Sequence, residues 1–292
     1  MAQRSWDGTT YGSGGMHRWL IRLLRWLDVR ILYVFSNIFV IPVCVVFRPG
    51  GRIIYRYFRQ HHGMGRWKAA WKTYVNHCKF GQVVIDRFAM YAGKQFQVDI
   101  EGYAHFLRLS EKPEGFVQLS AHVGNYELAG YTLRAEDKRM NALVFFGEKA
   151  SVMENRRRMF EGNNIRMIEV RSDMSHLFEI DRALSDGEIL SMPADRFTGS
   201  EKSLTYSFLG ADARFPLGPF SVATMRGLDV LAVNVMKSGT KRYTIYVCPL
   251  AYDKDAPRQA QIRQLASAYV EELERVVRRY PEQWYNYFDF WK

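Results

Sequence analysis

Residues 116–127 read FVQLSAHVGNYE, and their pattern predicts a strand, a turn and the start of a helix. It opens with a short apolar run typical of a strand, and the segment from Tyr126 to Leu133 is typical of a helix. Gly124 and Asn125 lie between the two, where the chain must turn. A strand, a turn that carries a histidine and then a helix is the arrangement by which an α/β fold places a base at the carboxyl edge of its sheet.

His122 and Glu127 in this stretch are candidates for a base and its partner. A neutral imidazole accepts a proton near neutral pH, and it does so better when a carboxylate holds its tautomer. Side chains five positions apart point roughly 140° away from each other within one helix. With His122 in the turn and Glu127 in the first helical turn, however, the two can meet. No G-x-S-x-G motif occurs, so the base would act directly on a substrate hydroxyl or amine.

The same spacing recurs at His176 and Asp181. Residues 175–184 read as one amphipathic helix, which would keep these two side chains apart. We therefore interpret His176 as a histidine on a helix face.

Residues 121–127, AHVGNYE, resemble the His-x-Gly-Asn-Trp-Glu signature of the bacterial lipid A late acyltransferases, with Tyr126 in place of the usual Trp. These enzymes are a branch of the lysophospholipid acyltransferase superfamily. The resemblance continues in order from about residue 30 to the C-terminus. It implies an O-acyltransferase that moves a fatty acyl chain from acyl carrier protein onto a hydroxyl of a lipid A precursor, with no metal and no organic cofactor.

The resemblance also implies residues that bind substrate. Gly124 and Asn125 belong to the signature, and residues 154–160, ENRRRMF, stand where the family has an arginine-bearing segment thought to meet the anionic head group. Arg156, Arg158 and Arg171 are therefore expected to contact anionic lipid, because guanidinium groups bind phosphate with two hydrogen bonds. The alternative is that these arginines only form the solvent-exposed face of a helix.

Two further segments resemble the family. Residues 187–196 match its strand that ends in Pro and Asp, which makes Asp195 a site candidate, although Arg196 departs from the usual pattern. Residues 208–218 match its glycine and proline block, read as a tight loop in which Gly210 either approaches a substrate or only turns the chain. The ending PEQWYNYFDFW, residues 281–291, is an aromatic patch expected to pack on the domain or dip into lipid rather than to react.

The chain is strongly basic, with 41 Lys and Arg against 30 Asp and Glu, a net charge of +11. Such a surface attracts nucleic acid, anionic lipid or an acidic protein. No nucleic-acid motif is present and basic residues concentrate near apolar segments, so an anionic membrane surface is favoured over nucleic acid. The three cysteines are far apart and suggest neither a disulfide framework nor a metal site, as in a reducing compartment.

The N-terminal part changes character twice. Residues 1–16 are polar and Gly-rich, and we expect disorder; residues 17–28 read as a basic amphipathic helix, suited to a membrane interface or to ordinary packing on the domain. Residues 31–47 carry no charge and are interrupted by Pro42. They predict a membrane anchor, either a short span or a segment embedded in one leaflet, with a buried core helix as the alternative. Arginines at both ends give no orientation.

The remaining patterns complete a domain organisation. Helices are predicted over 65–92 and 257–280, and strands over 96–100, 141–146, 230–235 and 241–247. The fold class is α/β: a mixed, mostly parallel sheet flanked by helices, preceded by a helical membrane-binding segment. We expect a disordered N-terminus over 1–16, the membrane-associated helices over 17–60 and the α/β acyltransferase domain over 61–292.

The expected function is acyl transfer at the cytoplasmic face of the inner membrane. One alternative is an acyltransferase with another acceptor, such as a lysophospholipid, an amino-acid lipid or a polyene-type lipid. The other is a non-catalytic membrane adaptor with the same fold.

Overall fold

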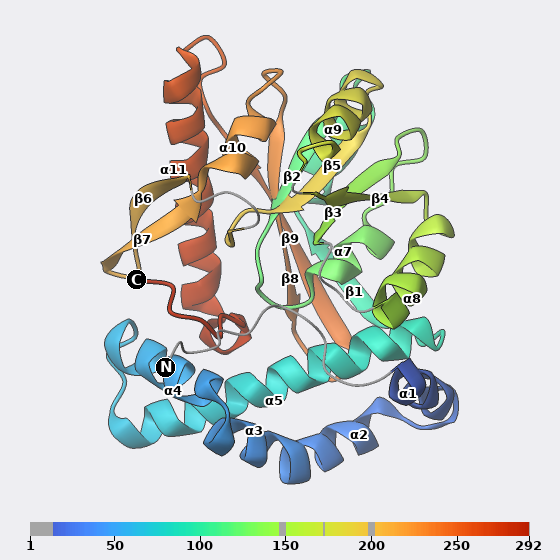
Figure 1. The fold of residues 1–292 in the computed structure, drawn as a ribbon, viewed down its shortest axis with the longest axis vertical. Coiled ribbons are helices and arrows are strands. Elements are labelled where there is room, and N and C mark those ends of the chain that lie inside the picture. Colours follow the sequence, from blue (N-terminus) through green and yellow to red (C-terminus); the bar gives the residue numbers. More distant parts are fainter. Residues whose placement is uncertain (1–13, 146–149, 172, 198–201, 292) are drawn as a thin grey trace.

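The computed structural model describes residues 14–145, 150–171, 173–197 and 202–291. In this part of the chain a seven-stranded sheet stands above a layer of N-terminal helices, with further helices on both of its faces (Figure 1). The predicted α/β fold with a flanked, mostly parallel sheet is therefore confirmed.

The central sheet has the strand order β1-β9-β8-β2-β5-β3-β4. Every neighbouring pair is parallel except β8 and β9, which form a hairpin from the strands predicted over 230–235 and 241–247. All five residues of β2 are buried, because helices cover both of its faces. The strands are β1 (Gln97–Glu101), β2 (Phe116–Ser120), β3 (Met140–Phe145), β4 (Ile165–Val170), β5 (Ile189–Pro193), β8 (Val230–Lys237) and β9 (Arg242–Leu250).

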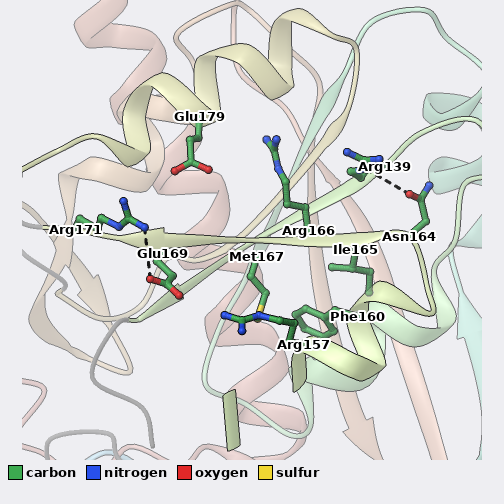
Figure 2. Close-up of a pocket in the computed structure, with 10 residues that line it drawn as sticks. All are labelled: Arg139, Arg157, Phe160, Asn164, Ile165, Arg166, Met167, Glu169, Arg171 and Glu179. Carbon is green, nitrogen blue, oxygen red and sulfur yellow. Dashed lines mark hydrogen bonds and ion pairs between the residues drawn. The ribbon is translucent and has the colours of Figure 1, made fainter. Parts of the chain in front are cut away.

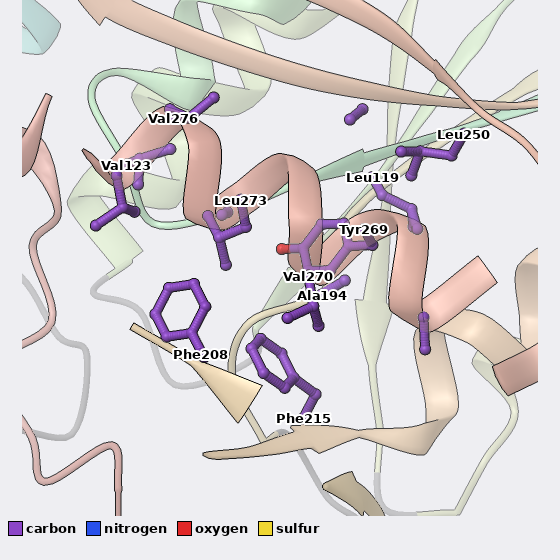
Figure 3. Packing of buried hydrophobic residues seen from close by; sticks show 14 of the residues in the cluster. Leu119, Val123, Ala194, Phe208, Phe215, Leu250, Tyr269, Val270, Leu273 and Val276 are labelled. Atoms are coloured by element: carbon purple, nitrogen blue, oxygen red, sulfur yellow. The ribbon is translucent and has the colours of Figure 1, made fainter. Parts of the chain in front are cut away.

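Alternate residues along the strands enter two separate apolar cores. Val117 and Leu119 of β2 pack in one core with the long helix α11 (Figure 3), whereas Phe116 packs in the other. Helices of the first core include α9 (His176–Ser185), α10 (Leu217–Ala223) and α11 (Arg258–Arg279), which is followed by the short η2 (Pro281–Gln283). Helices of the second include α6 (Tyr103–Ser110), α7 (Tyr126–Thr132) and α8 (Ala150–Glu161). Both cores also take residues from the N-terminal helices.

The N-terminal layer is built on one long helix, α5 (Arg66–Tyr91). The helices before it are α1 (Gly14–Trp26), α2 (Val29–Phe35), the π-helical η1 (Ser36–Val40), α3 (Ile41–Phe47) and α4 (Pro49–Gln60). Helix α5 lies between the sheet and the helices α2 and α3 (Figure 1). Pro42 lies in the first turn of α3, directly after the π-helical η1, so the predicted interruption is a change to π-helical geometry within a run that stays helical from Val29 to Phe47.

The predicted amphipathic helix over 17–28 is α1, which begins earlier, at Gly14. The expected disorder over 1–16 otherwise falls on residues 1–13, which lie outside the described residues.

The predicted loop over 208–218 is wrong in its main feature. This region contains half of a two-stranded antiparallel sheet made of β6 (Ser203–Phe208) and β7 (Ala211–Pro216). The turn between them is Leu209-Gly210, with φ values of 53° and 82°. Two successive positive φ angles are typical of the tight hairpin turn whose twist matches that of the flanking strands.

Candidate active site

His122 lies in the turn that follows the central strand β2, at the carboxyl edge of the sheet. Gly124 in the same turn has a φ of 54°, and a Cβ atom there would lie 1.8 Å from the carbonyl oxygen of Val235. Its N–H donates to the carbonyl of Gln283 over 2.8 Å. The turn can therefore exist in this form only with glycine at position 124.

Asp195 is the partner of His122. The Nδ1 atom of His122 lies 2.7 Å from Oδ1 of Asp195, and the backbone N–H of His122 donates to Oδ2 over 2.9 Å. The reason is strand register: β2 and β5 are parallel neighbours that pair Ser120 with Pro193, so His122 and Asp195 both lie two residues beyond paired positions. The pair therefore forms where two adjacent strands end.

This geometry determines the chemistry of the imidazole. With Asp195 buried and acting as acceptor at Nδ1, the proton of the neutral ring resides on Nδ1, and Nε2 is the nitrogen that can take a proton. Burial lowers the pKa of His122 and the charge of Arg196 lowers it further, against the opposing effect of Asp195. The ring thus stays neutral at physiological pH, and 20% of its side chain remains accessible.

The predicted contact between His122 and Glu127 is wrong. The first turn of α7 directs Glu127 toward α5 and α8. Its Oε1 accepts hydrogen bonds from Tyr91 of α5 (2.6 Å) and from Tyr131 of α7 itself (2.9 Å). Its Oε2 forms ion pairs with Arg87 (2.9 Å) and Arg156 (3.2 Å).

This cluster has a strongly perturbed carboxylate at its centre. Burial raises the pKa of Glu127, but Arg156 and Arg87 outweigh burial and hold it at about 2. Glu127 is therefore an anchor that ties α7 to α5 and α8 behind the turn of His122.

The three predicted lipid-binding arginines do not gather around His122. Arg156 is buried in the Glu127 cluster, so its predicted contact with lipid is wrong. Arg158 is exposed and pairs with Glu154 over 3.0 Å on the same helix.

Arg171 alone of the three lines a cavity, of about 450 Å³, over β4 between α8 and α9 (Figure 2). Arg139, Arg157 and Arg166 also line this cavity, together with Glu169 and Glu179, so its charged side chains are mainly basic. His122 is not among its lining residues.

The other predicted substrate contacts lie elsewhere. Asn125 is buried, directly before α7 in the turn that carries His122. Gly210 occupies the hairpin turn of the separate sheet β6–β7, where its positive φ accounts for the glycine. Among the described residues, no three His, Cys, Asp or Glu side chains gather where they could hold a metal ion.

The C-terminal aromatic segment packs on the domain and reaches the site. Trp284 is fully buried, and it pairs with Val123 of the histidine turn through a β-bridge. The backbone N–H of Tyr285 donates to the carbonyl of His122 over 3.1 Å. Sequence reasoning found this patch but missed that its backbone holds the turn.

The role of Asp195 was also missed, although the residue was singled out. Its signal was a carboxylate directly after an apolar strand, at the same offset as His122 after its own strand. Only the neighbouring positions of β2 and β5 in the sheet turn that signal into a pair.

Comparisons with known proteins identify the family of this chain. No curated protein matches the chain. Among solved structures, the 1-acyl-sn-glycerophosphate (LPA) acyltransferase PlsC from Thermotoga maritima is similar, with 16% sequence identity and a TM-score of 0.38, over 88% of this chain and 99% of that one. The sequence profile described as bacterial lipid A biosynthesis acyltransferase matches residues 88–292, which include His122, Asp195 and the whole central sheet. Since that match covers more than two thirds of the chain, the protein belongs to the bacterial lipid A biosynthesis acyltransferase family and is an acyltransferase.

Proposed function

We propose that the protein transfers a fatty acyl chain from an acyl carrier protein thioester to a hydroxyl of a lipid A-type acceptor, with His122 as general base. The observation that carries this proposal is the His122–Asp195 pair at the sheet edge, with Nδ1 2.7 Å from the carboxylate. A base held in one tautomer by a buried carboxylate suits direct attack of a hydroxyl on a thioester.

The reaction proceeds in one transfer. Nε2 of His122 takes the proton of the acceptor hydroxyl while the hydroxyl oxygen attacks the thioester carbonyl carbon. A carbon–oxygen bond forms, the carbon–sulfur bond breaks, and the leaving sulfur receives the proton from the imidazolium. Asp195 stabilises that imidazolium while it exists. General base catalysis contributes roughly 10²–10⁴-fold, and positioning of the two substrates supplies much of the remainder.

The charge of the protein supports both substrates. A net charge of +11 suits an acidic carrier protein as donor. Arg171 follows β4 at the same sheet edge as His122, three strands away, or roughly 14 Å at ~4.8 Å per strand. An acceptor that meets both residues must be large and anionic, as a phosphorylated glycolipid is. The carrier protein thioester places the reaction on the cytoplasmic face of the inner membrane.

The test is acyl transfer with defined substrates. The full chain in lipid vesicles is given acyl carrier protein loaded with a fatty acid, and release of the carrier thiol is measured together with the mass of the lipid product. Release should require a lipid A precursor and should stop in His122→Ala. Equal turnover with lysophosphatidic acid would overturn the acceptor assignment, and turnover with acyl-CoA alone would overturn the donor.

A further inference from the structure

The apolar run Val29–Phe47 is docked along α5 rather than detached from the domain. It is long and apolar enough to cross a membrane by length and composition, yet α2, η1 and α3 all contact α5. The hydroxyl of Tyr74 on α5 donates to the carbonyl of Asn37 over 3.0 Å. On the same helix a Cβ at Gly81 would lie 3.3 Å from Ile41, so the two helices approach closely there.

A buried polar cluster fixes the start of this run to the sheet. Asp86 of α5 is fully buried and accepts hydrogen bonds from Tyr33 of α2 and from Tyr243 of β9. Lys237 of β8 donates to Asp86 over 2.5 Å and to the Tyr33 hydroxyl over 3.2 Å. A run that left α5 to cross a bilayer would remove one partner from this buried carboxylate, which is strongly unfavourable.

The chain on both sides of the run also stays on the domain. Before it, Leu24 of α1 is fully buried in a core shared with Phe88 of α5. After it, Ile54 and Phe58 of α4 are fully buried in the first core, which also contains Val117 and Leu119 of β2. Both ends of the run are therefore attached to the domain and lie on the same side of the bilayer, whereas a helix that crosses the bilayer must have its two ends on opposite sides of it.

The side of the run that faces away from α5 carries an exposed apolar stripe. The helices of the run, α2 and α3, form the lower edge of the molecule in Figure 1. Each side chain of the stripe is between 44% and 77% exposed, and these side chains recur every three or four positions. The stripe consists of Ile31, Val34, Phe35, Ile38, Phe39, Val40, Val43, Val46 and Phe47. Two tryptophans beside it, Trp26 at the end of α1 and Trp67 at the start of α5, are each 91% exposed.

The charges around the stripe identify its occupant. Residues 14–60 contain eight arginines and a single acidic residue, Asp28, and all eight arginines are exposed. Exposed tryptophans and arginines around an apolar face are typical of a helix that lies in the interface of an anionic bilayer. A second copy of this chain docked on this N-terminal layer would bring eight more arginines to it and would be repelled.

We propose that Val29–Phe47 lies in the plane of one leaflet of an anionic membrane, with the exposed stripe in hydrocarbon, and does not cross the bilayer. Helix α5 then separates the active site from the lipid. It contacts the run on one side, and its Arg87 pairs with Glu127, which lies in the cluster behind His122. This placement concerns membrane attachment alone and does not depend on the identity of the acyl donor or acceptor.

Single cysteines report on which side each end of the run lies. With Cys44, Cys78 and Cys248 replaced by alanine, cysteine is introduced at Arg25, Arg52 or Gln259, all exposed. Sealed membrane vesicles are then treated with a membrane-impermeant maleimide, with and without detergent. Gln259, on α11, reports the side of the catalytic domain. In-plane attachment predicts that Arg25→Cys and Arg52→Cys label like Gln259→Cys; labelling of either one on the opposite side would overturn it.

A charge-insertion pair tests the occupant with the native cysteines in place. Phe39→Glu with Val43→Glu puts two carboxylates in the stripe, and Phe178→Glu, at an 82% exposed residue of α9, is the matched control. Binding to vesicles of phosphatidylglycerol and phosphatidylethanolamine should weaken at least tenfold in the double variant and stay unchanged in the control. Unchanged binding, or a parent dimer that the double variant converts to a monomer, would overturn the proposal.

Discussion

The Nδ1 atom of His122 and the Oδ1 atom of Asp195 lie 2.7 Å apart, although 73 residues separate them in the chain. Neither residue is strained toward the other, because the register of two adjacent parallel strands delivers both to one edge. This pair therefore depends on the integrity of the sheet and not on one local motif.

Replacement of His122 by alanine should lower acyl transfer by at least 10²-fold, because the hydroxyl proton then has no acceptor. The matched control is His176→Ala, whose ring only accepts from the backbone N–H of Arg171 over 3.3 Å. Turnover is measured as release of carrier thiol, and circular dichroism checks the fold. Activity of His122→Ala within tenfold of the parent would contradict the role of His122.

Replacement of Asp195 by asparagine should reduce kcat by up to roughly 10⁴-fold with a small change in KM, because the imidazole loses its fixed tautomer and the imidazolium loses its counter-charge. Stability should change little beside this, since asparagine can keep a hydrogen bond to the backbone of His122. Near-parental kcat would show that Asp195 only supports the turn.

The pH dependence of kcat/KM gives a separate test of the same pair. Transfer requires neutral His122, so activity should rise with pH through the pKa of this ring, which burial places below its usual 6.5. In Asp195→Asn the carboxylate that favours the protonated ring is gone, so the residual activity should extend to still lower pH. An acid limb that moves upward in the variant would be inconsistent with this arrangement.

Glu127→Gln should lower the stability of the protein, and this should be its main effect. It leaves Arg87 and Arg156 buried without their carboxylate, and breaking such a pair costs about 3–5 kcal/mol at pH 7. In the parent protein, ionised Glu127 contributes to the free energy of unfolding. This contribution is lost as the pH falls from the pKa of Glu127 in the unfolded chain, 4.5, to its pKa in the folded protein, about 2, a difference worth about 3 kcal/mol. Urea unfolding at several pH values measures it.

One control accompanies this variant. Glu154→Gln removes a carboxylate from an exposed ion pair with Arg158 and should cost less than about 1 kcal/mol. Equal destabilisation by both substitutions would show that the buried ion pairs of Glu127 contribute no more to stability than an exposed ion pair does.

Gly124→Ala should disturb the turn more than Gly210→Ala does, although both glycines have positive φ. Nothing lies within 4 Å of a Cβ at Gly210, so alanine there costs about 1 kcal/mol through φ alone. At Gly124 the same atom overlaps the Val235 carbonyl, which adds about 1–3 kcal/mol and moves His122. Thermal unfolding and turnover of the two variants check the difference; equal losses would contradict it.

Sequence patterns predicted the elements whose periodicity is strong. The strand, turn and helix around His122, the long helices α5 and α11 and the hairpin of β8 and β9 all lie where expected. β4 was missed because it is an edge strand with charged Arg166 and Glu169, which hides its apolar alternation. The hairpin of β6 and β7 was missed because Leu209-Gly210 was interpreted as part of a loop.

The partner of His122 could not be predicted for a different reason. A carboxylate five residues away is visible in the sequence, whereas proximity to Asp195 arises only when β5 pairs with β2. The cluster around Glu127 likewise draws Arg87, Tyr91 and Tyr131 from two helices. Contacts between distant segments depend on strand order, and a single sequence does not disclose strand order.

The hydrogen bond from Tyr285 to the carbonyl of His122 has a consequence for biosynthesis. Tyr285 is translated 163 residues after His122, which takes roughly 8–30 s at ~5–20 residues per second. Helices α1 to α5 leave the ribosome before either residue. The N-terminal helices of a nascent chain can therefore bind the membrane before Tyr285 has been synthesised. At that stage the turn that carries His122 still lacks the hydrogen bond from Tyr285, so membrane binding precedes completion of the active site.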